Sequence, residues 1–352
     1  MIFPTLDTPC VLVDLDIDED NIRKYKAHCA GNALRQRTHI KTHKLPGLAK
    51  YQVAQGAVGI TCQKVSEAEA MIAEGGIDDV LITYNILGDT KTARLRALSE
   101  KVRLSVVADN DMVANGLSRA FADAATPLNV LVECNTGANR CGVATPAAAA
   151  ELARLIDRLP GLTFGGLMTF PPVGRMEEAE AWLIEAKTLI EATGLQVNVI
   201  SSGGSPDMWR AHGKGPVTEH RIGTYVYNDR SLVAHGACTW QDCALTVLAT
   251  VVSVPSSNHA IVDAGSKVLT TDLFGQVGHG HVLGREDLAI DQLSEEHGRI
   301  VSDGPINLNV GERLRIVPNH ACVVANMLDK VEGVRGTKLA GPMPVAARGQ
   351  VW

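Results

Sequence analysis

The sequence is poor in aromatic residues, has no excess of basic residues and contains no long hydrophobic run. Aromatic side chains make up 4% of 352 residues, and 33 Lys and Arg against 39 Asp and Glu give a net charge of −6. Binding to nucleic acid depends on a basic surface and aromatic platforms, so we expect no nucleic-acid partner. No apolar run reaches about 18 residues, so we expect no membrane span.

Closely spaced cysteine pairs are also missing. The chain has eight cysteines, none in a CxxC pair. The N-terminus has neither the positive segment nor the apolar segment of a secretion signal. We therefore expect reduced thiols and a cytoplasmic location.

The order of apolar patterns indicates two domains. Hydrophobic residues make up 45% of the chain, and about 150 residues form a typical domain. Short β-rich runs alternate with amphipathic stretches, which predicts a (β/α)8 TIM-type barrel with its site at the C-terminal ends of the strands. The expected strands are 38–41, 58–63, 79–84, 102–109, 128–134, 162–170, 196–201 and 221–227. The expected helices include 65–74, 145–159 and 175–193.

Beyond about residue 235 the pattern changes to strand-like runs separated by Gly, Pro and Asp, which predicts an all-β domain. The runs are 245–254, 259–269, 299–302, 313–324 and 330–334. We assign 15–235 to the barrel, and 1–14 with 236–352 to the β domain.

A lysine flanked by two histidines stands at the end of the first expected barrel strand, in residues 38–44 (THIKTHK). Side chains alternate along a strand, so His39, Lys41 and His43 are expected on one face. Lys41 there could form a Schiff base with a carbonyl group or with pyridoxal phosphate (PLP), with two proton carriers beside it. The alternative is a solvated polar strand end.

Two glycine-bearing segments are candidates for anion binding. Residues 201–205 (SSGGS) follow an expected strand and precede an expected helix at 206–212, an arrangement that suits a phosphate; a plain flexible loop is the alternative. Residues 223–225 (GTY) could complete a phosphate site. Arg140, in a loop after another strand, could bind a phenolate or carboxylate, or simply pair with a neighbouring acid.

In the β domain, His320 and Cys322 are two residues apart in the segment PNHAC. We expect a strand here, which would place both side chains on one face. Imidazole and thiolate are zinc ligands, and two protein ligands would leave coordination positions open. A buried structural cysteine beside an unrelated histidine is the alternative reading.

Taken in order, these segments resemble the alanine racemase-like PLP enzymes of fold type III, and more closely the branch containing D-serine dehydratase and D-threonine aldolase. The resemblance spans nearly the whole chain. It rests on DTP at 7–9, HIKTHK at 39–44, TCQKVSEA at 61–68, NRCGV at 139–143, SSGGS at 201–205, GTYVY at 223–227, DAGSK at 263–267 and PNHAC at 318–322.

The resemblance implies roles for individual residues. Lys41 would hold PLP, with His39 and His43 as further catalytic candidates, and His320 and Cys322 would bind a divalent metal, zinc or manganese. A homodimer acting on a small D-β-hydroxy amino acid is also implied. The implied cofactor-binding residues are Lys41, Gln63, Arg140, Thr169, Ser202, Gly203, Gly204, Gly223, Thr224 and Tyr225.

Two reactions are consistent with this resemblance. Removal of the α-proton by Lys41 and loss of the β-hydroxyl give a 2-oxo acid and ammonia, whereas removal of the hydroxyl proton breaks the Cα–Cβ bond and gives glycine and an aldehyde. The His-x-Cys pair resembles the dehydratases, since aldolases typically have His-x-Asp. The segment 166–172 (GLMTFPP) lacks the histidines of aldolases but does not closely match the dehydratases either. An amino-acid racemase is the least favoured alternative, because it has no use for the metal pair.

Overall fold

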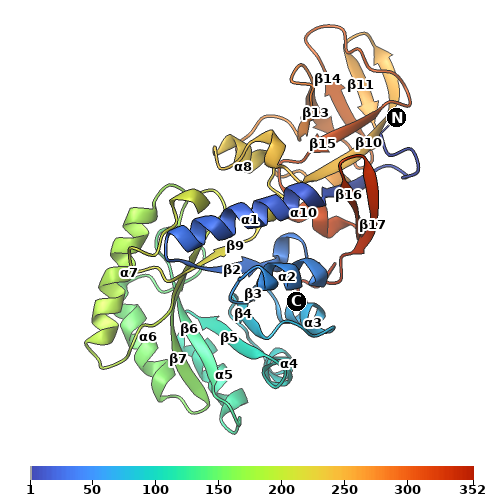
Figure 1. Cartoon of the computed structure of the whole chain (residues 1–352). Helices are drawn as coiled ribbons and strands as arrows, with labels where there is room; N and C mark the ends of the chain where they lie inside the picture. Colours follow the sequence, from blue (N-terminus) through green and yellow to red (C-terminus); the bar gives the residue numbers. More distant parts are fainter. Residues whose placement is uncertain (1) are drawn as a thin grey trace. The chain divides into compact units, whose positions relative to one another are not determined.

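The computed structural model describes residues 2–352 and divides the chain into two compact units. The sheet unit comprises Met1–Lys24, Thr42–Leu45 and Thr224–Gly349, and the barrel unit comprises Tyr25–Lys41, Pro46–Gly223 and Gln350–Trp352. Figure 1 shows the elements of each unit. Within residues 2–352, no helix is both long enough and apolar enough to span a membrane.

The barrel unit contains a closed barrel of eight parallel strands, β2 to β9 in sequence order, which confirms the predicted barrel. Most predicted strands are found within a few residues of the expected bounds. The strands are β2 (Arg35–His39), β3 (Ile60–Cys62), β4 (Asp79–Ile82), β5 (Arg103–Ala108), β6 (Leu128–Cys134), β7 (Leu162–Thr169), β8 (Ile200–Gly203) and β9 (Glu219–Ile222).

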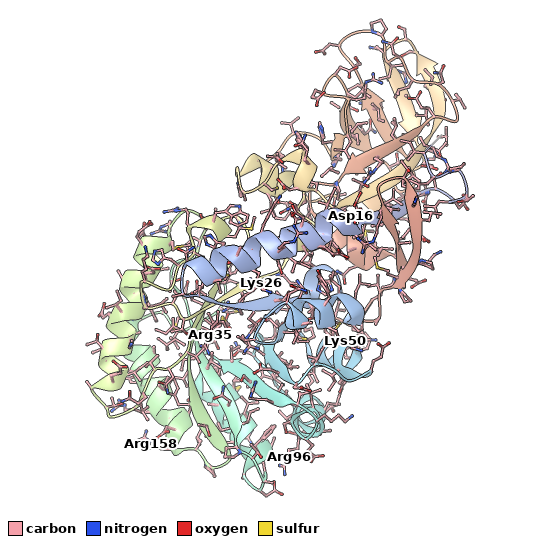
Figure 2. The ribbon with its side chains drawn as sticks, viewed as in Figure 1. Asp16, Lys26, Arg35, Lys50, Arg96 and Arg158 are labelled. Atoms are coloured by element: carbon pink, nitrogen blue, oxygen red, sulfur yellow. The ribbon has the colours of Figure 1, made fainter. Side chains whose placement is uncertain are left out.

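Helices separate successive barrel strands from β2 to β8, and their ends follow from local sequence. In α6 (Pro146–Arg158), the Thr145 hydroxyl accepts a hydrogen bond from the Ala148 N–H, and proline occupies the first helical position. Figure 2 labels Arg96, on the outer helix α4 (Asp89–Ser99), and Arg158, on the outer helix α6. The remaining helices of this part are α2 (Pro46–Ala54), α3 (Val65–Ile72), α5 (Asp111–Phe121) and α7 (Met176–Glu191). The boundary between the units falls within α1 (Leu15–Gly31).

The sheet unit is built on nine strands in the order β13-β14-β11-β10-β1-β16-β17, with β15 pairing with β10 and β12. The early strand β1 lies between β10 and β16, so the N-terminus is part of this sheet. The strands are β1 (Cys10–Asp14), β10 (Leu245–Ser256), β11 (His259–Val262), β12 (His281–Val282), β13 (Ala289–Leu293), β14 (Gly298–Val301), β15 (Arg313–Val317), β16 (Lys330–Arg335) and β17 (Lys338–Pro344).

Short helices interrupt two of the strands expected in the sheet unit. The run 259–269 is a strand only to Val262 and ends in α9 (Ser266–Leu269). The run 313–324 is a strand only to Val317, because Pro318 has no N–H to continue the ladder, and α10 (Ala321–Met327) follows. A further short helix, α8 (Arg230–Ala234), lies in the same unit.

A buried histidine in the barrel unit is expected to make the stability of the fold depend on pH. His220 on β9 is 2% exposed, and its Nδ1 lies 2.6 Å from the Tyr25 hydroxyl. Burial lowers the pKa of His220 to about 3, and the neighbouring Arg221 acts in the same direction. Below pH 6.5 the unfolded chain therefore binds a proton that the folded chain does not, and the free energy of unfolding falls as the pH decreases toward 3.

We expect this histidine to contribute a loss of up to ~1.4 kcal/mol per pH unit below pH 6.5. His220→Asn should remove that contribution, so its urea midpoints at pH 7, 6 and 5 should decline less steeply than those of the unmodified protein. Equal slopes for the two proteins would show that His220 becomes protonated in the folded state.

Candidate functional site

The predicted cofactor residues of the barrel unit lie at the C-terminal ends of different strands. Barrel enzymes build their sites at this end from residues of several strands. His39 ends β2, with Lys41 in the 3-10 turn that follows, Gln63 follows β3, Arg140 follows β6 and Thr169 ends β7. Ser202, Gly203 and Gly204 are at the end of β8, and Gly223 follows β9.

The expectation that His39, Lys41 and His43 share a strand face is wrong. Strand β2 ends at His39, and residues Ile40–Thr42 form a 3-10 turn, in which side chains two positions apart do not point the same way. Lys41 is exposed, whereas His43 is 1% exposed. His43 also belongs to the sheet unit, where its Nδ1 accepts a hydrogen bond from the Leu45 N–H and its ring lies edge-on to Tyr227.

The backbone N–H of Lys41 nevertheless lies close to a histidine, and that histidine lies close to a glutamine. The Lys41 backbone N–H is 3.5 Å from His39 Nδ1, and His39 Nε2 is 3.3 Å from Gln63 Oε1. Burial lowers the pKa of His39 well below its usual value, and the charges of Lys41 and Arg221 act in the same direction. A neutral His39 can accept a proton at one ring nitrogen while it is oriented through the other.

The glycine-bearing loop after β8 differs from expectation in one respect. The expected helix at 206–212 is absent: only a 3-10 turn at Met208–Arg210 is formed, because a segment this short is a poor helix nucleus. A phosphate here would therefore lack a helix dipole. Gly204 has a φ of 129°, and an added Cβ would meet only the Phe170 ring at 4.0 Å, so open space lies beside its backbone.

A buried arginine that sequence reasoning missed lies among these residues. Arg221 on β9 is 6% exposed and donates hydrogen bonds to the Ser201 hydroxyl at 2.8 Å and the Thr169 carbonyl at 2.6 Å. Burial lowers its pKa to about 10, against the opposing effect of Glu219 and Glu133. The available sequence signal was a run of charged and polar residues, Glu219 to Arg221, that leads into the expected strand at 221–227.

Arg140 is exposed and stacks over the Phe170 ring at 4.8 Å. Its charge also acts on Glu133, whose pKa is raised by burial and lowered in part by Arg140. The exposed guanidinium of Arg140, after the end of β6, has N–H groups that can donate hydrogen bonds to an anionic ligand.

The opposite end of the barrel holds a cavity of about 530 Å³ lined by charged residues. Four of its charged residues form ion pairs within the protein: Arg37 lies 2.5 Å from Asp79 and 2.9 Å from Glu219, and Arg103 lies 2.6 Å from Asp79. Such a network at the N-terminal end of the strands is typical of stability and not of catalysis.

In the sheet unit, His320 and Cys322 are not on a strand as expected. His320 is the N-cap residue of α10 and Cys322 is its second residue, since β15 ends before Pro318. Their side chains still meet through a hydrogen bond. Burial alone would lower the pKa of His320, but Cys322 and the carboxylate of Asp229 together raise it to about 10.

Two hydroxyl groups surround the sulfur of Cys322. Thr42 Oγ1 lies 3.2 Å from Cys322 Sγ, and Thr224 Oγ1 lies 3.4 Å from it. Tyr225, which follows Thr224 in the chain, is 1% exposed. Within residues 2–352, no group of three or more His, Cys, Asp or Glu side chains is arranged to hold a metal.

Comparison with known proteins places the whole chain among characterised relatives. The 3-hydroxy-D-aspartate aldolase of Paracoccus denitrificans is 35% identical over 98% of this chain and 93% of its own length. The crystal structure of D-threonine aldolase from Filomicrobium marinum matches with a TM-score of 0.87 and 32% identity, covering 99% of this chain and 97% of that one.

Structures of D-threo-3-hydroxyaspartate dehydratase are also similar. A cysteine-to-alanine variant in its metal-free form has a TM-score of 0.87 and 27% identity, covering 98% of this chain and 99% of that one. A histidine-to-alanine variant, changed two positions earlier in that protein, matches with a TM-score of 0.88.

Two family models cover most of the sequence. The alanine racemase N-terminal domain model matches residues 13–231, and the putative serine dehydratase domain model matches residues 244–334. The chain belongs to the family of alanine racemase-like proteins that combine these two domains.

Proposed function

We propose that this protein is a PLP-dependent lyase acting on β-hydroxy D-amino acids, and that it catalyses β-elimination. The observation that carries the choice of elimination is the His320–Cys322 pair, which has the same residue types and spacing as the two positions altered in the D-threo-3-hydroxyaspartate dehydratase variants. The structure of the cysteine variant is of its metal-free form. We assign a metal-binding role to Cys322.

The residues of the barrel unit fit PLP. Lys41 is exposed at the end of the barrel where active sites are built, and the backbone of Gly204 borders open space. PLP supplies an electron sink at the substrate α-carbon when it is bound. We assign Lys41 Nζ to attachment of the cofactor and to removal of the α-proton, and His39 and His43 to proton transfer. The remaining cofactor contacts within the barrel unit are assigned to Gln63, Arg140, Thr169, Ser202, Gly203, Gly204 and Gly223. The resemblance also implies cofactor contacts for Thr224 and Tyr225, which belong to the sheet unit.

The residues around Cys322 fit a divalent metal such as zinc. Imidazole and thiolate are suitable ligands, and the two threonine hydroxyls can donate hydrogen bonds to the sulfur once it is a thiolate. A metal held by two protein ligands keeps positions for the substrate hydroxyl and water, and it would supply a Lewis acid that assists loss of hydroxide. We also propose a homodimer, in keeping with the resemblance.

Retro-aldol cleavage is the second candidate, because the 3-hydroxy-D-aspartate aldolase relative is 35% identical and the D-threonine aldolase structure matches over 99% of the chain. Cleavage requires a base at the β-hydroxyl proton and leaves the α-proton in place. The two functions therefore differ in which proton the protein removes.

Product analysis by mass spectrometry separates these candidates. The protein is incubated with PLP and zinc or manganese, and with D-threo-3-hydroxyaspartate or D-threonine. We expect oxaloacetate or 2-oxobutanoate together with ammonia. Glycine with glyoxylate or acetaldehyde would overturn elimination in favour of aldol cleavage, and no reaction with any β-hydroxy D-amino acid would overturn the proposed substrate class.

A further inference from the structure

Asp229 is a buried carboxylate that bridges two elements of the sheet unit. It is the N-cap residue of α8: its Oδ1 accepts hydrogen bonds from the Leu232 N–H at 3.1 Å and the Ser231 hydroxyl at 2.6 Å. Its Oδ2 points to the start of α10, where it accepts a hydrogen bond from the Ala321 N–H at 3.0 Å and lies 3.3 Å from His320 Nδ1. The side chain is fully buried.

The contact with His320 determines which ring nitrogen is available to a ligand. A carboxylate only accepts hydrogen bonds, so the contact is a hydrogen bond when Nδ1 carries a proton. The Nε2 lone pair of the neutral ring is then free to coordinate a metal. Carboxylates that hold metal-binding histidines in this way raise the basicity of the ring and fix its orientation.

The hydrogen bond from the Ala321 N–H to Asp229 has two effects. It gives the N–H group an acceptor, and it fixes the position of the Asp229 carboxylate. Because the same Oδ2 atom accepts from a backbone N–H next to His320, the carboxylate and the imidazole are kept in register by the chain itself. The Phe274 ring packs edge-on against His320 with centroids 4.8 Å apart, which restricts rotation of the imidazole from another side. The contacts with Asp229 and Phe274 therefore restrict the orientation of His320 before any ligand binds.

We propose that Asp229 is a positioning residue for the metal ligand His320: it holds the imidazole with Nε2 directed to the metal. This inference rests on the proposed function, because it requires His320 and Cys322 to bind a metal. Asp229 itself does not touch the metal or the substrate. Its removal should therefore weaken metal binding without removing either ligand.

Asp229→Asn and Asp229→Ser test this role. Both side chains retain an oxygen that can cap α8, and serine is too short to reach His320. We expect both variants to bind Zn²⁺ about 10–100-fold more weakly than the unmodified protein, the range typical for loss of such a partner. Affinity is measured by competition with a chromophoric chelator on PLP-loaded protein, and the thiolate-to-metal absorption of the Co²⁺ form reports whether Cys322 still binds.

Asp14→Asn is a matched control, since Asp14 is a buried carboxylate of the same unit that accepts a hydrogen bond at the start of α1 from the Asp16 N–H at 3.2 Å. Ser231→Ala is a second control, because it removes only a partner of Oδ1. Both controls should keep the metal affinity of the unmodified protein. Thermal unfolding of the metal-free proteins measures the cost of the altered caps separately, so a variant that only destabilises the fold is recognised.

The outcomes distinguish this inference from the proposed function. Unchanged Zn²⁺ affinity in both Asp229 variants, with metal lost in Cys322→Ala, would overturn the positioning role and leave the metal site intact. If the unmodified protein binds no Zn²⁺ beyond that bound by Cys322→Ala, the proposed metal site itself fails. If neither Asp229 variant folds while Asp14→Asn does, the carboxylate is primarily structural and the positioning role is rejected.

Discussion

Replacement of Lys41 by alanine is expected to abolish the absorption band of lysine-bound PLP and to lower the turnover of a β-hydroxy D-amino acid by at least about 10²–10⁴-fold. Lys41 is assigned two functions, attachment of the cofactor and removal of the α-proton, and alanine can perform neither. Absorbance titration with PLP and a coupled assay for the 2-oxo acid measure the two losses.

Two lysine-to-arginine variants distinguish a requirement for a primary amine from a requirement for a positive charge. Arginine keeps the positive charge but does not form a Schiff base, so Lys41→Arg should fail as Lys41→Ala does. Lys44 lies three residues further along the chain, and Lys44→Arg should keep both the band and the activity. Retention of the PLP band in Lys41→Arg together with its loss in Lys44→Arg would reassign the cofactor lysine to Lys44.

The barrel could be predicted from the sequence because its strands are short apolar runs with helices between them. That pattern arises because the buried faces of strands and helices carry apolar side chains, and the spacing of apolar residues can be seen directly in the sequence. The geometry around Lys41 could not be predicted in the same way. Whether a strand continues or turns after His39 depends on tertiary contacts, and the 3-10 turn at Ile40–Thr42 separates Lys41 from His43 in exposure.

The surroundings of His320 and Cys322 could not be predicted from the sequence either. Spacing alone suggested that His320 and Cys322 share a strand face, yet they meet at the start of a helix. Their contact depends on Pro318 ending the strand. The partners that surround the pair come from distant segments: Asp229 precedes α8, and Thr42 is 280 residues away from Cys322. No local motif connects these residues.

Replacement of Cys322 by alanine is the second large effect that we expect. The variant should lose its bound metal and its lyase activity together, because an imidazole alone is a weak site and the Lewis acid for the β-hydroxyl would be absent. Metal content by elemental analysis and turnover of the same substrate measure the two losses. Treatment of the unmodified protein with a chelator should reproduce the loss of activity, and added Zn²⁺ should restore it there but not in the variant.

Cys29→Ala is the matched control for this variant, because Cys29 is also buried, at 4% exposure, but lies on α1 in the barrel unit. It should keep both metal and activity. If Cys322→Ala keeps its metal, the thiol is structural, and the shared His-x-Cys spacing no longer supports elimination. If the variant loses its metal but retains full activity, then the α-proton and the hydroxyl are handled by protein side chains alone, and His39 and His43 become the groups to test as the acid that protonates the departing hydroxide.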